Sequence, residues 1–351
     1  MKTTSLLLLS LLLSSCGGSG SEPQPEPPLP PALGSLREAA FPFGAAVNVN
    51  LLRSSAAYQG VVTREYRSVT AENAMKFRSL HPDAATYAWT DADYLVQYAR
   101  QTNSRVHGHT LIWHNSLPAW VTGFQGDSAA WETLMKTHIQ TVVGHFRGQV
   151  ASWDVVNEAV AEDGTLRPSP WLQHLGPDYV ARAFQYARQA DPDAKLFYND
   201  YGHEYGPTKR TAILNLVSSL KARGIPIDGI GLQLHTSLTR SDANLATAIT
   251  SAAQTGLLVH ISELDVAVNP GNQAGLAWSD ALAAAQKAKY KLIVQTFNAL
   301  PAAQRFGITT WNVTDADTWV RGACGCPDWP LPFNEQYQKK PAYDGIVEGL
   351  Q

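Results

Sequence analysis

The sequence of 351 residues predicts an α/β fold of the (β/α)8 TIM-barrel type, in which eight parallel strands close into a ring inside a layer of helices. Three observations predict this fold. Eight short apolar segments recur along the chain, segments with helical periodicity lie between them, and nearly every apolar segment ends in polar residues. Strands that alternate with helices imply a parallel sheet, and eight such units in one domain imply a closed barrel.

The predicted strands are short apolar segments. They cover residues 41–49, 68–73, 105–114, 151–158, 195–200, 230–235, 257–266 and 306–313. The segment WDVVNEA at 153–159 illustrates the pattern, because its body is apolar and Asn157 and Glu158 follow directly.

The predicted helices bury one face. Residues 91–102, 133–146, 178–190 and 211–224 carry apolar side chains at spacings of three and four, and Gly224 ends the last of them. A doubly wound open sheet is the alternative fold. It does not require eight similar units, however, and no glycine-rich phosphate loop follows the first strand.

The N-terminal segment predicts export. In residues 1–15, Lys2 precedes an apolar stretch that is too short to span a bilayer, as in a signal peptide. Leu13-Ser14-Ser15-Cys16 resembles the bacterial lipoprotein signal, in which the Cys becomes the lipid-bearing first residue; an ordinary secretory signal is the alternative. Residues 16–36 are rich in Gly, Ser and Pro, which predicts a semi-stiff linker before a barrel domain at 37–351. We therefore expect a protein that is lipid-anchored to the bacterial cell envelope, at the outer membrane, or else secreted.

The composition excludes some partners and favours others. A formal net charge of −3, without a run of five like charges, argues against nucleic acid, which selects for a basic stripe. Ten Trp and thirteen Tyr provide flat surfaces on which sugar rings can stack. We expect a monomer whose only membrane contact is the lipid at Cys16.

Polar side chains end the predicted strands. In barrels of this type the active site is built at the C-terminal ends of several strands, so these side chains should converge on one rim. In chain order they are Glu72 and Asn73, then His109, Trp113 and His114, then Asn157 and Glu158, Asn199 and Asp200, Gln233 and His235, Glu263 and Asp265, and Trp311.

Glu158 and Glu263 are the two carboxyl groups expected to carry out the chemistry. They are 105 residues apart, which places them on the fourth and seventh strands, facing across the barrel mouth. Two carboxyl groups across a Trp-lined pocket can cleave a glycosidic bond: one protonates the leaving oxygen, and the other attacks the sugar carbon or activates water. His235 would keep Glu263 ionised as a nucleophile, with Asp265 on the same side of the strand, and the charge of Glu263 would keep Glu158 protonated.

Five motifs resemble glycoside hydrolase family 10, the endo-β-1,4-xylanases. In chain order they are VTAENAMKF, HGHTLIWHNSLPAW, WDVVNEA, IGLQLH and ISELDV, and the match extends over residues 41–345. The resemblance implies retaining hydrolysis of xylan or xylo-oligosaccharides by double displacement, with Glu158 as acid/base, Glu263 as nucleophile, and no cofactor or metal.

The resemblance also implies a set of substrate-binding residues. Asn157 matches the contact to the sugar 2-hydroxyl, two histidines surround the same sugar, three polar residues contact the next sugar toward the non-reducing end, and three Trp form an aromatic cage. The full set is Glu72, Asn73, Lys76, His109, Trp113, Asn157, Gln233, His235, Trp311 and Trp319.

Four positions depart from the family pattern. The family usually has Gln at Ser116, Asn at Gly202, Gly at Asn312 and Arg at His107. Ser116 and Gly202 are smaller than the usual residues and remove hydrogen-bonding reach from the cleft, so we expect catalysis to be retained while the subsite preference stays open.

Two alternatives to a xylanase stay open from the sequence. The scaffold could act on glucose-based β-1,4 chains, or it could bind sugar without cleaving it, although both Glu residues and their supporting residues are present. Cys324 and Cys326 are separated by one Gly. A bridge between them would close a very small, strained ring, but an exported protein permits it, and two thiols alone make a poor metal site. We therefore expect a disulfide that stiffens this loop.

Overall fold

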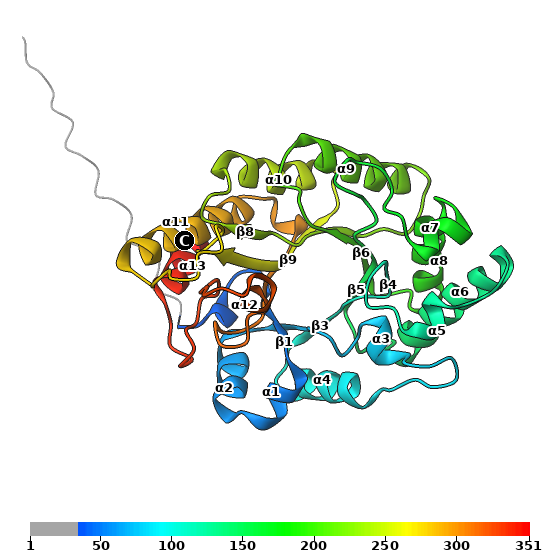
Figure 1. Cartoon of the computed structure of the whole chain (residues 1–351), viewed down its shortest axis with the longest axis horizontal. Helices are drawn as coiled ribbons and strands as arrows, with labels where there is room; N and C mark the ends of the chain where they lie inside the picture. Colours follow the sequence, from blue (N-terminus) through cyan, green and yellow to red (C-terminus); the bar gives the residue numbers. More distant parts are fainter. Residues whose placement is uncertain (1–33) are drawn as a thin grey trace, which may run out of the picture. The chain divides into compact units, whose positions relative to one another are not determined.

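The computed structural model describes residues 34–351 (Figure 1). The predicted signal peptide, Cys16 and the linker up to residue 33 lie outside the described residues. Of the linker predicted at 16–36, its last residue, Leu36, is fully buried in the folded body and begins the short 3-10 helix η1 (Leu36–Glu38).

Eight parallel strands form a closed ring, which confirms the predicted fold. Each strand pairs with its neighbours in parallel, and β10 pairs with both β1 and β9 to close the barrel. The eight strands are β1 (Phe43–Val47), β2 (Ser68–Ala71), β3 (Arg105–Gly108), β5 (Ser152–Asn157), β6 (Lys195–Asp200), β7 (Gly229–Leu232), β9 (Leu258–Ala267) and β10 (Arg305–Trp311).

Two short strands extend the barrel at its C-terminal side. The predicted strand 105–114 is divided into β3 and β4 (Ile112–Trp113), with a cis peptide bond between His109 and Thr110. The predicted strand 230–235 likewise ends at β7, and β8 (His235–Ser237) then pairs with β9. Both divisions occur where the chain leaves the ring, so Trp113 and His235 lie on the extensions, and His109 and Gln233 lie between the ring strand and its extension.

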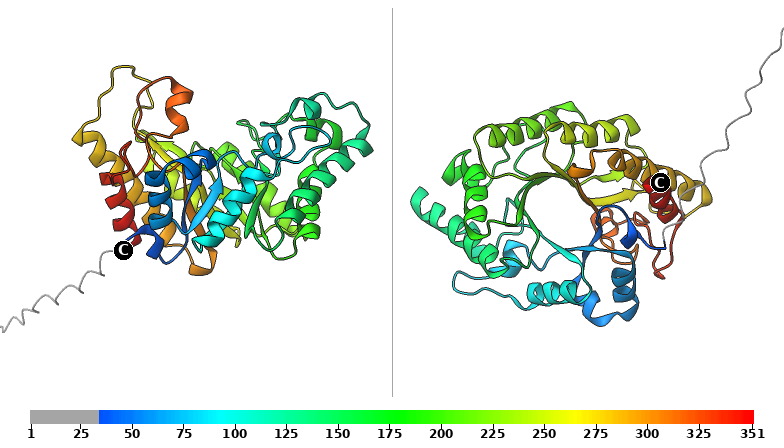
Figure 2. Two further views of the ribbon diagram at one scale, coloured as in Figure 1. Left: turned by 90° about the horizontal axis from the view of Figure 1, so that it is seen from below. Right: turned by 180° about the vertical axis from the view of Figure 1, so that it is seen from behind.

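Helices surround the ring (Figures 1 and 2). The four helices predicted from periodicity correspond to α4 (Thr90–Gln101), α6 (Ser128–His145), α8 (Tyr179–Ala190) and α9 (Pro207–Ala222). The others are α1 (Val49–Ser54), α2 (Ala56–Glu65), α3 (Phe77–Leu80), α5 (Ala119–Thr122), α7 (Pro170–Leu175), α10 (Asp242–Gln254), α11 (Asp280–Asn298), α12 (Trp319–Cys324) and α13 (Pro341–Leu350), with η2 (Ala302–Gln304) before β10. Within the part of the chain that is described, no helix is both long and apolar enough to cross a membrane.

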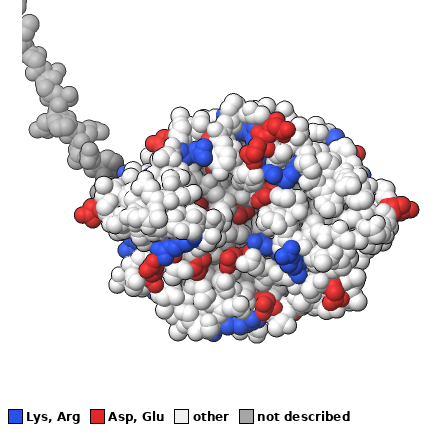
Figure 3. All heavy atoms as spheres, viewed as in Figure 1, with Lys and Arg blue, Asp and Glu red and all other residues white. Residues whose placement is uncertain are grey.

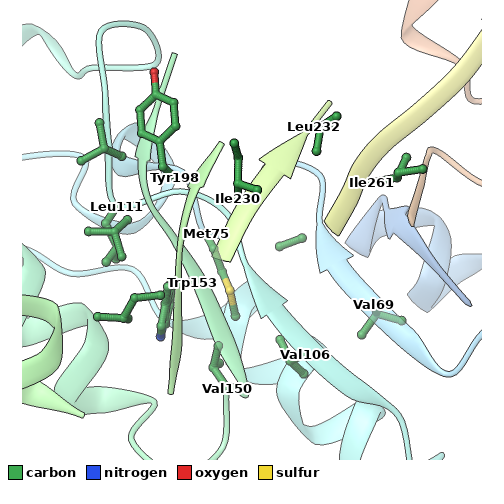
Figure 4. Packing of buried hydrophobic residues seen from close by; sticks show 14 of the residues in the cluster. Val69, Met75, Val106, Leu111, Val150, Trp153, Tyr198, Ile230, Leu232 and Ile261 are labelled. Carbon is green, nitrogen blue, oxygen red and sulfur yellow. The ribbon is translucent and has the colours of Figure 1, made fainter. Parts of the chain in front are cut away.

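The hydrophobic core fills the layer between strands and helices (Figure 4). Val106, Tyr198, Ile230 and Ile261 are fully or almost fully buried there. Because side chains alternate along a strand, their neighbours point into the barrel, and these neighbours are largely polar. Apolar packing thus holds the helices on the ring and leaves the inside of the barrel for polar contacts that reach the mouth.

Candidate active site

One cleft at the barrel mouth contains every residue predicted to touch substrate. Its volume is about 500 Å³. Acidic and basic side chains surround the hollow at the centre of this face (Figure 3). The two carboxyl groups line it together with the ten predicted binding residues, Glu72, Asn73, Lys76, His109, Trp113, Asn157, Gln233, His235, Trp311 and Trp319.

Glu263 enters the cleft at a bulge in β9. Between two paired positions, Ile261–Ile308 and Leu264–Thr310, β9 has one residue more than β10. A bulge of this kind bends the strand and re-aims a side chain. The Glu263 side chain is consequently almost buried, with 6% of its surface exposed.

His235 connects Glu263 to Asp265. Its Nε2 lies 3.2 Å from Glu263 Oε2, and its Nδ1 lies 2.7 Å from Asp265 Oδ2. Burial opposes a charge on His235, but the two carboxylates outweigh it, Asp265 first, and raise the pKa of His235 to about 10. The imidazolium therefore stands between two carboxylates at neutral pH.

The same contact keeps Glu263 ionised. Burial raises the pKa of Glu263, yet the hydrogen bond from His235 and the nearby imidazoles of His235 and His109 more than offset burial, and the net pKa is lowered. A buried carboxylate that stays charged is what a nucleophile requires. Trp319 Nε1 also donates to Asp265 Oδ2 at 2.8 Å, which ties the cleft wall to the Asp265–His235 pair.

Glu158 follows β5 in a different environment. The sequence places it directly after the strand, and its backbone adopts the left-handed conformation, with φ of 56°. Such a conformation is unfavourable for a residue with a side chain and is concentrated at functional sites. Gln233 Nε2 donates to Glu158 Oε1 at 3.0 Å, and His114 Nδ1 lies 3.9 Å from Oε2. With 13% of its side chain exposed, Glu158 is more open to solvent than Glu263.

Asn199 joins the two halves of the site. Its Nδ2 donates to Asn157 Oδ1 at 2.9 Å and to Glu263 Oε1 at 2.7 Å, and its Oδ1 accepts from Ser262 Oγ. The strand register aligns Asn157, Asn199 and Gly231 on adjacent strands. A Cβ at Gly231 would lie 2.3 Å from Asn199 Oδ1, so only glycine leaves room for this amide. Asn199 appeared in the sequence as a polar strand end, but its link to Glu263 depends on a contact 64 residues away.

Asp154 orients His109 from inside the barrel. Asp154 Oδ2 lies at hydrogen-bond distance from His109 Nδ1, 2.9 Å away, and fixes the orientation of the ring. His107 Nε2 approaches the same oxygen at 3.0 Å, and its Nδ1 lies 2.7 Å from Ser152 Oγ. Burial opposes the charge on Asp154, but the two histidines more than offset it and hold the pKa of Asp154 well below its usual range. His107, where the family usually has Arg, thus supplies part of the compensation for a buried carboxylate.

Polar and aromatic groups pack together at the other end of the cleft. Lys76 Nζ donates to Asn73 Oδ1 at 2.9 Å and lies 5.4 Å and 5.6 Å from the ring centroids of Trp113 and Trp311. Burial lowers the pKa of Lys76, although nearby carboxylates partly restore it. The ammonium group therefore sits against two rings, with hydrogen-bond donors left for a ligand.

Three cleft residues were missed by sequence reasoning. Asn115, Tyr201 and Tyr205 line the cleft beside the predicted set. Tyr201 follows the polar end of β6 directly, and this position alone was a signal for it. Tyr205 has 42% of its surface exposed, which is unusual for a large aromatic side chain. Its ring packs against Gly202, where a Cβ would lie 3.3 Å from the ring. The absence of a side chain at position 202 therefore allows the Tyr205 ring to pack this close to the backbone.

The remaining predicted residues lie elsewhere. Cys324 and Cys326, at the end of α12 and just beyond it, are joined by a disulfide. Cys16 lies outside the described residues. Within residues 34–351, no group of three or more His, Cys, Asp or Glu side chains is arranged to hold a metal ion.

A parallel barrel with two carboxyl groups in unequal environments, across an aromatic cleft, defines a glycoside hydrolase. The model of glycosyl hydrolase family 10 matches residues 32–349, and the chain belongs to this family.

Named relatives agree with this assignment. The chain is 41% identical over 344 residues to endo-1,4-beta-xylanase A of Cellvibrio japonicus, a match that covers 89% of this chain and 56% of that protein. It is 39% identical over 328 residues to an endo-1,4-beta-xylanase of Geobacillus stearothermophilus, covering 89% and 98%. Xylanase 10B of Thermotoga petrophila, solved in complex with xylobiose, superposes with a TM-score of 0.85 at 37% identity, covering 90% of this chain and 97% of that chain. The chain thus spans little more than half of the Cellvibrio enzyme.

Proposed function

We propose that the protein is a retaining endo-β-1,4-xylanase, in which Glu263 is the nucleophile and Glu158 the acid/base. The observation that carries the proposal is the difference between the two carboxyl groups. Glu263 is buried and kept ionised by a protonated histidine, whereas Glu158 is more open to solvent and bonded to an amide. Unequal environments are how a site assigns two carboxyl groups to two roles.

The proposed reaction has two steps. In the first, Glu263 attacks the anomeric carbon while Glu158 gives its proton to the leaving glycosidic oxygen, which forms a glycosyl ester on Glu263 and releases the shorter chain. In the second, Glu158 takes a proton from water, the hydroxide adds to the anomeric carbon, and the bond to Glu263 breaks. Two inversions at the same carbon retain its configuration.

The contacts around the nucleophile favour positioning of the sugar at the cleavage point. Both donors to Asn157 Oδ1, from Asn199 and Gln233, hold the amide in one orientation. We infer that its Nδ2 faces the sugar 2-hydroxyl and that His109 Nε2 forms a hydrogen bond with a second hydroxyl. Hydrogen bonds to the 2-hydroxyl strengthen in the transition state, so this fixed amide would contribute to the rate.

The substrate class rests on the relatives. Both curated relatives described above carry the name endo-1,4-beta-xylanase, and the solved relative binds xylobiose. We expect reducing sugar to be released from xylan and not from carboxymethylcellulose. The products of plain xylan should be a ladder of short oligosaccharides early in the reaction. Release of xylose alone from one end would instead indicate an exo-acting enzyme.

Rescue of two variants tests the two roles. Glu263→Ala should lose turnover on xylan by more than about a thousandfold, and azide should then restore reaction of an activated aryl xyloside with formation of an α-azide. Glu158→Ala with azide should form the β-azide, because the glycosyl ester on Glu263 still forms. Asp163→Ala, an exposed carboxylate outside the cleft, serves as the matched control. Unchanged turnover in Glu263→Ala would reject it as nucleophile.

We further propose export, with a lipid on Cys16 that tethers the barrel to the bacterial cell envelope at the outer membrane, through the linker. The leader composition and the position of Cys16 support this. Labelled palmitate should be incorporated by the parent chain and not by Cys16→Ser, whereas labelling of neither would favour simple secretion. A monomer is expected because, among residues 34–351, the exposed large apolar side chains are Tyr205 and Trp319, and both line the cleft.

A further inference from the structure

A second cavity lies on the same face of the barrel as the cleft. Its volume is about 340 Å³, and it shares no lining residue with the cleft. Trp278 and Trp329 line it, from the loop after β9 and the loop after α12. The catalytic scheme uses neither residue, and both are half-buried.

The two indole rings form one tilted platform. Their centroids are 5.6 Å apart, and their planes meet at 60°. Lys340 Nζ lies 4.6 Å from the centroid of Trp278, and the guanidinium of Arg321 lies 5.8 Å from that of Trp329. Each ring is thus supported by a cation. Indole rings also offer flat apolar faces on which sugar rings can stack.

The backbone that carries Trp329 is held firmly. Asp328 Oδ1 accepts from the N–H of Trp329 at 2.7 Å and from that of Val268 at 2.9 Å, which ties the two loops together. The carbonyl of Trp329 accepts from Gln286 Nε2 at 2.6 Å and from Lys340 Nζ at 2.7 Å. Lys340 is almost fully buried and also pairs with Asp315 at 2.9 Å. A platform that is rigid before binding costs little entropy to use.

The rim of the cavity is polar and carries side chains of both charges as well as neutral amides. Asn334, Gln336, Glu335 and Lys339 line it and provide both donors and acceptors. Neutral sugars with many hydroxyl groups match such a mixed rim, whereas a nucleic acid or an acidic peptide would need an excess of cations. A docking partner with an apolar surface would need a larger exposed apolar area than this cavity offers.

We propose that this cavity is a second binding site for the xylan chain, separate from the catalytic cleft. The proposal rests on the proposed function, because it takes its ligand to be the same polymer. Trp319 at the start of α12 lines the cleft, and the loop after α12 carries Trp329, so one segment serves both sites. Holding a polymer at a second point raises its effective concentration at the cleft. Long chains should benefit and short oligosaccharides should not.

Affinity electrophoresis in gels that contain soluble xylan tests the proposal. The full chain carries Glu263→Ala in each case, so the polymer stays intact. Adding Trp278→Ala and Trp329→Ala should reduce the retardation, and the affinity for xylan calculated from it should fall about three- to tenfold. One or two lost stacking contacts correspond to this change. Trp89→Ala is the matched control, because Trp89 is also half-buried, stacks on His145 and lines neither site.

Kinetics with Glu263 intact separate this proposal from the proposed function. In the Trp278→Ala and Trp329→Ala variant, KM for long xylan should rise by a similar factor, while kcat/KM for a short xylo-oligosaccharide should equal that of the parent. The second site would be overturned by any of three results. These are equal retardation of parent and variant, a loss of retardation equal to that caused by Trp89→Ala, and altered turnover of the short substrate. A change from monomer to dimer or the reverse on gel filtration would instead assign the cavity to self-association. If the parent cleaves no xylan, the proposed function itself fails.

Discussion

The charge on His235 offers the sharpest test of the site, through Asp265→Asn. The substitution keeps the shape of the side chain and removes its charge, and the amide Oδ1 can still accept from His235 Nδ1 and Trp319 Nε1. The pKa of His235 is about 10, against an ordinary value of 6.5. This difference corresponds to roughly 5 kcal/mol in favour of the imidazolium. Asp265 is the largest favourable contributor to it.

Without the charge of Asp265, the pKa of His235 should fall toward the neutral range. Glu263 would then face an imidazole that has lost its proton, and its pKa would rise because burial would no longer be offset. The acid limb of kcat/KM should therefore move to higher pH, and kcat/KM at pH 7 should fall by about 100-fold, the typical effect of removing a positioned charged group. His235 should also lose its proton within the measured range.

Two measurements check this reasoning. The pH profile of kcat/KM on a short xylo-oligosaccharide reports Glu263, and an NMR titration of the His235 ring reports its proton directly. A single cooperative thermal unfolding transition should show that the variant is folded. A variant whose pH profile superimposes on that of the parent, with His235 still protonated at pH 8, would refute the role given to Asp265.

Three further predictions follow from particular contacts. Gly231→Ala should place a Cβ against Asn199, lower kcat about tenfold or more, and cost about 1–3 kcal/mol in stability, measured by initial rates and urea unfolding. Lys76→Met should raise KM for xylotetraose by about tenfold with a smaller change in kcat, because it removes a ligand contact distant from the reacting bond. A tenfold fall in kcat with an unchanged KM would contradict this. His138 is buried beside His81, with Nδ1 atoms 3.3 Å apart, and burial lowers the pKa of His138 well below its usual range. Its folded-state pKa is depressed, so its contribution to stability is complete above pH 6.5 and is lost as pH falls below that value, by about 2 kcal/mol at pH 5. In His138→Phe, the difference between urea midpoints at pH 7 and pH 5 should shrink accordingly, and an undiminished difference would assign the acid sensitivity to other groups.

The family departures show how local sequence and tertiary context interact. Asn312, where the family usually has Gly, adopts a φ of 80°, in the left-handed region that favours glycine. Asn tolerates this conformation better than most residues, and its Oδ1 here accepts from the backbone N–H of Trp319 at 3.2 Å. The side chain thus fixes the start of α12, next to the cleft.

Sequence alone determined the order of strands and helices, the barrel and the set of polar strand ends, because hydrophobic periodicity and strand boundaries are local properties of the chain. It also located Glu158 and Glu263 at one rim, since parallel strands in a closed ring bring their C-terminal ends together. The tertiary structure alone decided how the two carboxyl groups differ. A bulge in β9 turns Glu263 toward Asn199 and His235, and the left-handed backbone at Glu158 brings its carboxyl group to Gln233. These contacts join residues that are 28 to 75 positions apart in the sequence. A pattern within a short segment cannot predict which residue a side chain contacts at that separation.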